Sequence, residues 1–213
     1  MSKSTSRILA TLVVAASLMA SNAQAEFFGL PNGRLASPEM GSDLSVELGF
    51  VTGDLGTTDY QNFGARVNYR VAPNIVVIGD IGASEFGDAD GTPAGLGILY
   101  HLANQRISQN VDIAAKASYH SGEYKVSGVN IDLTGLSFEA LFSGRRPLAA
   151  NGLGWYGNFG FHRLTIKTNS SDSSNEIGFG GGLVLPTGAG EAYLGVDLID
   201  ELTFGLGFRY FVK

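Results

Sequence analysis

The sequence of 213 residues contains no cysteine, so it can form neither disulfide bonds nor thiolate-ligated metal sites. Its 20 Asp and Glu residues outnumber its 14 Lys and Arg residues, and the formal net charge of −6 argues against nucleic acid as a partner. Only 16% of the residues are charged, fewer than the roughly 25% of ordinary soluble domains, which favours a membrane protein.

The first 25 residues have the pattern of a secretory signal peptide. Lys3 and Arg7 precede an apolar stretch from Ile8 to Ala20, which is too short to span a bilayer comfortably. Ala23 and Ala25 provide the small side chains that a signal peptidase requires. We therefore expect cleavage after Ala25 and export from the cytoplasm.

Apolar residues alternate with small or polar residues in ten later segments, and a period of two predicts β-strands. The ten predicted strands are 43–51, 60–71, 75–84, 94–103, 110–120, 131–142, 153–167, 175–185, 191–199 and 202–211. An even number of strands of this length is typical of a closed bacterial barrel. The sequence thus predicts a closed antiparallel up-and-down transmembrane β-barrel of about ten strands over residues 41–213, with eight strands as the alternative. A periplasmic lead over residues 26–40 would precede it.

Short turns rich in Gly, Pro, Asn and Asp separate the predicted strands. If the N-terminus starts in the periplasm, the connections that face outside are 53–59, 85–93, 121–129, 168–174 and a tight turn at Asp200-Glu201. The last of these interrupts an alternation that otherwise continues in phase, and neither residue favours a tight hairpin.

One face of the predicted strands is apolar, and the other carries Gly, Ser, Asn and charged residues. The polar face lacks the Lys and Glu that would cover a solvated surface, so we expect it to line a crowded interior while the apolar face meets lipid. The predicted interior charges balance one another: Glu47, Asp80, Asp112, Glu139 and Asp197 against Arg66, Arg70, Lys116 and Arg209. A soluble lipid-binding barrel would show the reverse partition and would extract into buffer without detergent.

Aromatic residues gather near the predicted strand ends, as they do at membrane interfaces. The predicted aromatic girdles contain Tyr69, Tyr100, Phe142, Trp155 and Tyr210 at the periplasmic edge and Tyr119 towards the outer edge.

The signal peptide, the alternating strands and the C-terminal segment from Phe204 to Phe211 resemble small outer-membrane β-barrel proteins of Gram-negative bacteria. The OmpA-like and opacity-type barrels are the most similar families, with the YfaZ-type porins as a further possibility. Such barrels usually end on an aromatic residue that the outer-membrane assembly machinery reads, whereas Val212 and Lys213 follow Phe211 here. The resemblance implies an outer-membrane location and contact with that machinery, with outer-membrane lipid and with lipopolysaccharide.

Candidate catalytic groups are few. His120 lies beside Ser118 and Ser121, and an inward His162 could meet Asp197, but neither spacing matches a nucleophile with its base and oxyanion site. The acidic stretch from Glu85 to Gly91 lacks the ligand spacing of a calcium loop. We therefore expect no cofactor, no metal site and no enzymatic activity.

The function expected from the sequence is that of a non-enzymatic outer-membrane barrel. It would either admit small solutes through a narrow, porin-like lumen or have a structural or surface role in the cell envelope. The alternative is a lipid-modifying enzyme of the outer membrane, either a hydrolase or an acyltransferase.

Overall fold

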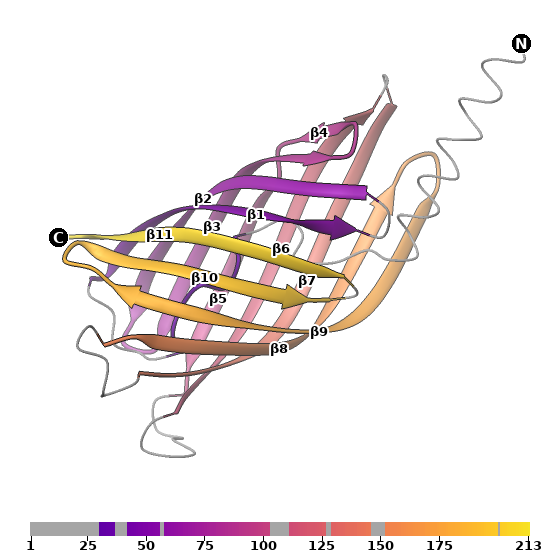
Figure 1. The fold of residues 1–213 in the computed structure, drawn as a ribbon. Coiled ribbons are helices and arrows are strands. Elements are labelled where there is room, and N and C mark those ends of the chain that lie inside the picture. The colour runs from indigo at the N-terminus through magenta and orange to yellow at the C-terminus, as the bar shows by residue number, and fades with distance from the viewer. Residues whose placement is uncertain are drawn as a thin grey trace, which may run out of the picture.

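The computed structural model describes residues 30–36, 42–55, 58–102, 111–126, 129–145, 152–199 and 201–213. These residues form one antiparallel sheet (Figure 1). Its strands are β1 (Leu44–Leu55), β2 (Thr58–Ala72), β3 (Ile75–Phe86), β4 (Ala89–Gly91), β5 (Ala94–His101), β6 (Asp112–Val126), β7 (Val129–Arg145), β8 (Gly154–Lys167), β9 (Ser171–Pro186), β10 (Gly190–Leu198) and β11 (Leu202–Val212). Among the described residues, no helix is long and apolar enough to cross a membrane.

The sheet closes on itself. Each long strand pairs with its sequence neighbours, and β1 pairs with β11 over ten residue pairs from Leu44↔Val212 to Gly53↔Thr203. Within the described residues, ten strands form the wall of the barrel, and the short strand β4 pairs between β3 and β6 at one end of it. This confirms the predicted closed antiparallel barrel and favours ten strands over eight.

Each long strand lies over one of the ten predicted segments, and several extend further. The predicted strand ends at 103 and 110 fall outside the described residues. The strands β1 and β2 are joined by residues 56–57 alone, and β6 and β7 by residues 127–128. The predicted break near Asp200-Glu201 is present, because β10 ends at Leu198 and β11 begins at its pairing partner Leu202. We call the end where β1 begins and β11 ends the terminal end, and the opposite end the far end.

The three-residue strand β4 was not expected. It lies between β3 and β6 near the far end, with Asp90 opposite both Glu85 and Lys125. It extends the wall beyond β5, which begins only at Ala94. The turn from β3 into β4 contains Gly87 at φ 55°, a left-handed conformation that glycine adopts at little cost.

Alternation divides the side chains between two environments over most of the barrel height. Exposed residues on the outer face are large and apolar, for example Leu96 at 68% and Leu206 at 59% exposure. Residues on the inner face are buried, and many of them are polar, such as Glu47 and Asn68, both at 0%. An apolar cluster on the same face packs against Ala36 of the N-terminal part of the chain: Val76, Ile78, Leu99, Ala114 and Leu141. Soluble proteins have the opposite arrangement, so this outer wall is suited to contact with lipid.

Candidate functional site

Glu47 is the centre of a polar network inside the barrel. Strand register places it directly opposite Arg66 on β2 and Arg209 on β11. One carboxylate oxygen accepts hydrogen bonds from Arg209 Nε at 2.8 Å and Asn68 Nδ2 at 2.6 Å, and the other accepts one from the Tyr193 hydroxyl at 3.1 Å. Arg66 lies within 3.8 Å of the same carboxylate. This buried charge is therefore satisfied on both oxygens, which a low-dielectric interior requires.

Two arms extend from this centre around the wall. On one side Arg66 Nε donates to Asp80 at 2.6 Å, and Asp80 contacts His120 Nε2 at 3.1 Å. On the other side Arg209 donates to Glu191 at 2.8 Å. Glu191, Arg209, Glu47, Arg66 and Asp80 thus form a continuous chain of opposite charges on neighbouring strands, and His120 reaches Asp80 across Gly95 of β5.

A second cluster lies across the interior. Lys116 on β6 faces Glu139 on β7, with 2.8 Å between Nζ and Oε2. The other oxygen of Glu139 accepts from Asn158 Nδ2 at 3.1 Å, and the same amide group lies 3.3 Å from Asp197 Oδ1.

The nine residues predicted to form the interior charge network differ in depth. Seven have buried side chains: Glu47, Arg66, Asp80, Lys116, Glu139, Asp197 and Arg209. Arg70 instead lies at the terminal end, is a quarter exposed and pairs with Asp43, while Asp112 is half-buried at the start of β6. Sequence reasoning missed Glu191, Tyr193 and Asn158 as members of the network. Each of them occupies an inward position in the alternation of its strand, and this was a usable signal.

Residues 30–36, here the luminal segment, run inside the barrel (Figure 1). The two central arginines hold its backbone: Arg66 donates to the carbonyl oxygens of Leu30 at 2.8 Å and Pro31 at 3.1 Å, and Arg209 donates to that of Gly33 at 2.9 Å. These charge-assisted bonds link the segment directly to the network.

Side chains of the luminal segment complete this attachment. Asn32 accepts from Lys116 Nζ at 2.7 Å and donates to Glu139 at 3.0 Å, and Arg34 donates to Asn68 at 3.1 Å. The Ala36 amide donates to Ser143 Oγ at 2.7 Å.

The lead over residues 26–40 was expected in the periplasm, but its residues 30–36 lie in the barrel interior. The rest of that lead and the signal-peptide residues Ala23 and Ala25 fall outside the described residues.

Glycine at position 205 makes room for this segment. A Cβ atom added there would come within 2.5 Å of Pro31 Cγ, closer than real atoms approach. We expect Gly205→Ala to displace the luminal segment, because the sheet is the more rigid partner and overpacking costs on the order of 1–3 kcal/mol. Tryptic cleavage after Arg34, now buried at 4% exposure, should become roughly tenfold faster or more.

Gly157→Ala is the matched control, because its added Cβ would meet only the Gly180 carbonyl at an ordinary 3.6 Å. Equal cleavage rates in the two variants and the wild type would contradict the close packing of Pro31 on β11.

The polarity of the two faces reverses near the far end. Inward residues there are apolar and form one buried cluster: Val51, Tyr60, Phe86, Ala89, Tyr124, Ile131, Leu133, Leu164 and Ile166. Outward residues at the same height are polar and exposed, such as Gln61, Glu123 and Asp132. This end of the barrel is built like a soluble protein, so the reversal marks where the outer wall passes from lipid to water.

The six residues predicted to form aromatic girdles all lie on the outer face. Tyr69, Tyr100, Tyr119, Trp155 and Tyr210 are exposed, and Phe142 is half-buried.

The histidines considered as catalytic candidates lie inside the barrel. Both ring nitrogens of the buried His162 lack a hydrogen-bond partner among the described residues, so it is not bonded to Asp197. Ser118 shares a hydrogen bond with Ser137, and His120 contacts Asp80. No group of three His, Asp or Glu residues in the described part of the chain is placed to hold a metal ion.

The fold and interior define a class: a closed β-barrel with an apolar outer wall and a polar lumen occupied by its own chain. No protein-family model matches the sequence, and no curated protein matches it. Solved structures similar in fold include the KdgM porin, with 11% identity, a TM-score of 0.41 and coverage of 79% of this chain and 99% of that one. The translocator domain of the autotransporter NalP from Neisseria meningitidis has 10% identity, a TM-score of 0.47 and coverage of 82% and 90%. The outer-membrane protease OmpT from Escherichia coli has 9% identity, a TM-score of 0.41 and coverage of 79% and 93%. At such low identity, no activity is transferred from these proteins to this chain.

Proposed function

We propose that this protein is a non-enzymatic, integral barrel of the Gram-negative outer membrane that its luminal segment keeps closed, and that it acts through its outer surface. The observation that carries the proposal is the attachment of residues 30–36 to the central arginines. A barrel of about ten strands has a narrow lumen even when empty, and here peptide backbone occupies it.

A membrane location is supported by the outer wall. Leu206 and its cross-strand neighbours Leu194 and Phe50 form part of an apolar surface that is too extensive for a soluble monomer. The predicted signal peptide supports export.

Closure by the luminal segment is supported by its place in the lumen. The segment and the charged network occupy the middle of the lumen, and the apolar cluster around Tyr60 and Tyr124 narrows the far end. Small solutes would pass only if the segment moved. This favours a structural or surface role in the envelope over steady porin-like conduction.

Single-channel conductance in a planar bilayer tests the proposal. We expect the mature protein to insert without steady openings, and a variant lacking residues 30–36 to conduct. Insertion is established separately by heat-modifiable migration and protease protection. A protein that inserts without conducting is thereby distinguished from one that fails to insert. Steady openings of the intact protein, with Arg34 still protected from trypsin, would contradict closure by the luminal segment.

Because deletion could impair folding, Gly205→Ala provides a second variant that leaves the chain length unchanged. It should open intermittently if the segment is the barrier, and Gly157→Ala should remain silent.

A further inference from the structure

Three buried side chains, Asn32 of the luminal segment, Lys116 of β6 and Glu139 of β7, form a closed triangle of polar contacts. Lys116 Nζ donates to Asn32 Oδ1 at 2.7 Å and lies 2.8 Å from Glu139 Oε2. Asn32 Nδ2 donates to the other oxygen of the same carboxylate, Oε1, at 3.0 Å. Each residue therefore contacts both of the others, and a reaction between Asn32 and Lys116 would join the segment to the wall.

The triangle contains an amine and an amide that are close enough to react. A carbonyl bond is about 1.2 Å long, so the hydrogen bond from Lys116 Nζ to Oδ1 keeps Nζ within about 4 Å of the side-chain carbon Cγ of Asn32. A small rotation brings the amine to the separation of about 3–3.5 Å from which a nucleophile attacks. Both side chains are held in place, because Asn32 is 1% exposed and Lys116 is 7% exposed.

Glu139 is placed to move the protons that such a reaction requires. One of its oxygens contacts the nitrogen that would attack, and the other contacts the nitrogen that would leave. A protonated lysine is not a nucleophile, so its proton must first pass to a base. Transfer to Glu139 converts a buried ion pair into two neutral groups, which need less solvation. Asn158 Nδ2 donates to Glu139 Oε1 at 3.1 Å and fixes the carboxylate in this position.

We propose that Lys116 and Asn32 form an isopeptide bond that joins the luminal segment covalently to β6. Lys116 Nζ gives one proton to Glu139, and its electron pair attacks Cγ of Asn32, which places a negative charge on Oδ1. Glu139 passes its proton to Nδ2 and accepts the surplus proton of Nζ. The Cγ–Nδ2 bond then breaks, and its electron pair leaves with Nδ2 as ammonia. Ammonia takes the proton from Glu139 and departs as ammonium, so the carboxylate is restored.

The reaction needs no oxidant and no second molecule, because an amide and an ammonium group give a new amide and an ammonium ion. It occurs once in each chain, so it is a maturation step and not an enzymatic activity. The inference rests on the placement of the luminal segment on which the proposed function also rests. It goes further, because a covalent bond would keep the segment in the lumen even when its hydrogen bonds to the arginines break.

Mass spectrometry of the refolded mature protein tests the bond. We expect a mass below that of the sequence by one ammonia, about 17 Da. After unfolding and tryptic digestion, the peptide that ends at Arg34 should be joined to a peptide in which Lys116 is uncut. A succinimide at Asn32-Gly33 would also lose ammonia but would link no second peptide. An intact mass equal to that of the sequence, or loss of ammonia without the joined peptides, would overturn the inference.

Two variants remove the reacting groups separately. Lys116→Arg keeps a cation beside Glu139 but has no nucleophilic amine, and Asn32→Ala removes the amide while leaving every strand of the wall unchanged. Both should keep the full mass of their sequences. Glu139→Gln should slow formation of the bond about a hundredfold or more, because it cannot accept the proton.

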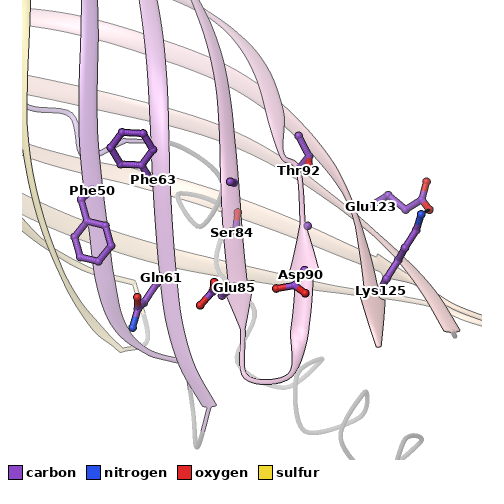
Figure 2. A pocket seen from close by; sticks show the side chains of 11 residues that line it. Phe50, Gln61, Phe63, Ser84, Glu85, Asp90, Thr92, Glu123 and Lys125 are labelled. Carbon is purple, nitrogen blue, oxygen red and sulfur yellow. Dashed lines mark ion pairs between the residues drawn. The ribbon is translucent and has the colours of Figure 1, made fainter. Parts of the chain in front are cut away.

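Lys125→Arg is the matched control for Lys116→Arg. Lys125 lies on the same strand, but it is exposed at a groove on the outer face and pairs with Glu123 at 3.6 Å (Figure 2). This variant should lose ammonia and give the joined peptides as the wild type does. Joined peptides in Lys116→Arg, or an unchanged rate in Glu139→Gln, would contradict the assigned roles.

Failure of the isopeptide bond and failure of the closed barrel give different results. If the wild type keeps its full mass and inserts without steady openings, the segment closes the lumen by non-covalent contacts alone and only the bond fails. If the joined peptides are found and the intact protein still opens steadily, the bond is present and closure fails.

Discussion

Glu47→Gln is expected to destabilise the barrel by roughly 3–5 kcal/mol, the usual cost of removing one partner from a buried ion pair. Glu47 is fully buried and compensates Arg209 at 2.8 Å and Arg66 at 3.8 Å. Glutamine retains the shape of the side chain but not its negative charge. The guanidinium groups of Arg66 and Arg209 would then have one carboxylate fewer to compensate them in the buried interior. Urea unfolding in liposomes, followed by the fluorescence of the single tryptophan, Trp155, measures the loss.

Glu123→Gln is the control for this experiment. Glu123 also pairs with a cation, Lys125 at 3.6 Å, but both side chains are more than half exposed. Exposed pairs contribute between about zero and 1 kcal/mol, so this variant should unfold like the wild type. Equal stability of the Glu47 and Glu123 variants would show that water reaches the network.

The same network couples wall stability to the luminal segment. Arg66 and Arg209 each use one part of the guanidinium for a carboxylate and another for a carbonyl of the segment. When Glu47 is neutral, both arginines lose part of their orientation. We therefore expect Glu47→Gln also to expose Arg34 to trypsin, a change that Glu123→Gln should not produce.

Most of the fold could be predicted from the sequence because the two faces of a barrel strand lie in different environments. Leu202, Phe204, Leu206 and Phe208 meet lipid, while Thr203, Gly205 and Gly207 face inward, so a period of two is visible in the residue types. The strand β4 could not be predicted in this way. Three residues, Ala89–Gly91, are too few to show a period.

Near the far end of the barrel, the residue types also alternate between the two faces, but with the opposite polarity. In β8 the inward residues change from His162 to Leu164 and Ile166, while the outward residues change from Phe161 to Arg163. The alternation persists, but its sense reverses where the wall leaves lipid. Reading every polar residue as inward would place these residues on the wrong face.

Parity predicts which face a side chain occupies but not its height or its distant partners. Arg70 has inward parity, yet it lies at the terminal end beside Asp43 rather than in the network. The luminal segment had no signal at all, because Leu30–Ala36 has no period and its contacts come from strands far away in the sequence. Space for it depends on glycines such as Gly49 and Gly205, which a sequence shows only as missing side chains.

Leu206→Arg is expected to impair assembly of the barrel strongly. Leu206 is 59% exposed on β11, between Phe50 on β1 and Leu194 on β10. Arginine at the bilayer midplane costs about 2–4 kcal/mol in a barrel, and the cost falls towards the interfaces. The fraction of protein that refolds into liposomes, scored by heat-modifiable migration, should fall accordingly.

Ser121→Arg places the same side chain on the same face but at a different height. Ser121 is exposed on β6, two residues beyond Tyr119 and two residues before the exposed Glu123. Its guanidinium would reach water and an acidic neighbour, so refolding should match the wild type. If both variants refold equally well into liposomes and unfold with the same midpoint, Leu206 does not face hydrocarbon. A loss confined to Leu206→Arg would instead fix the height of the lipid boundary between these two positions, where the reversal of polarity places it.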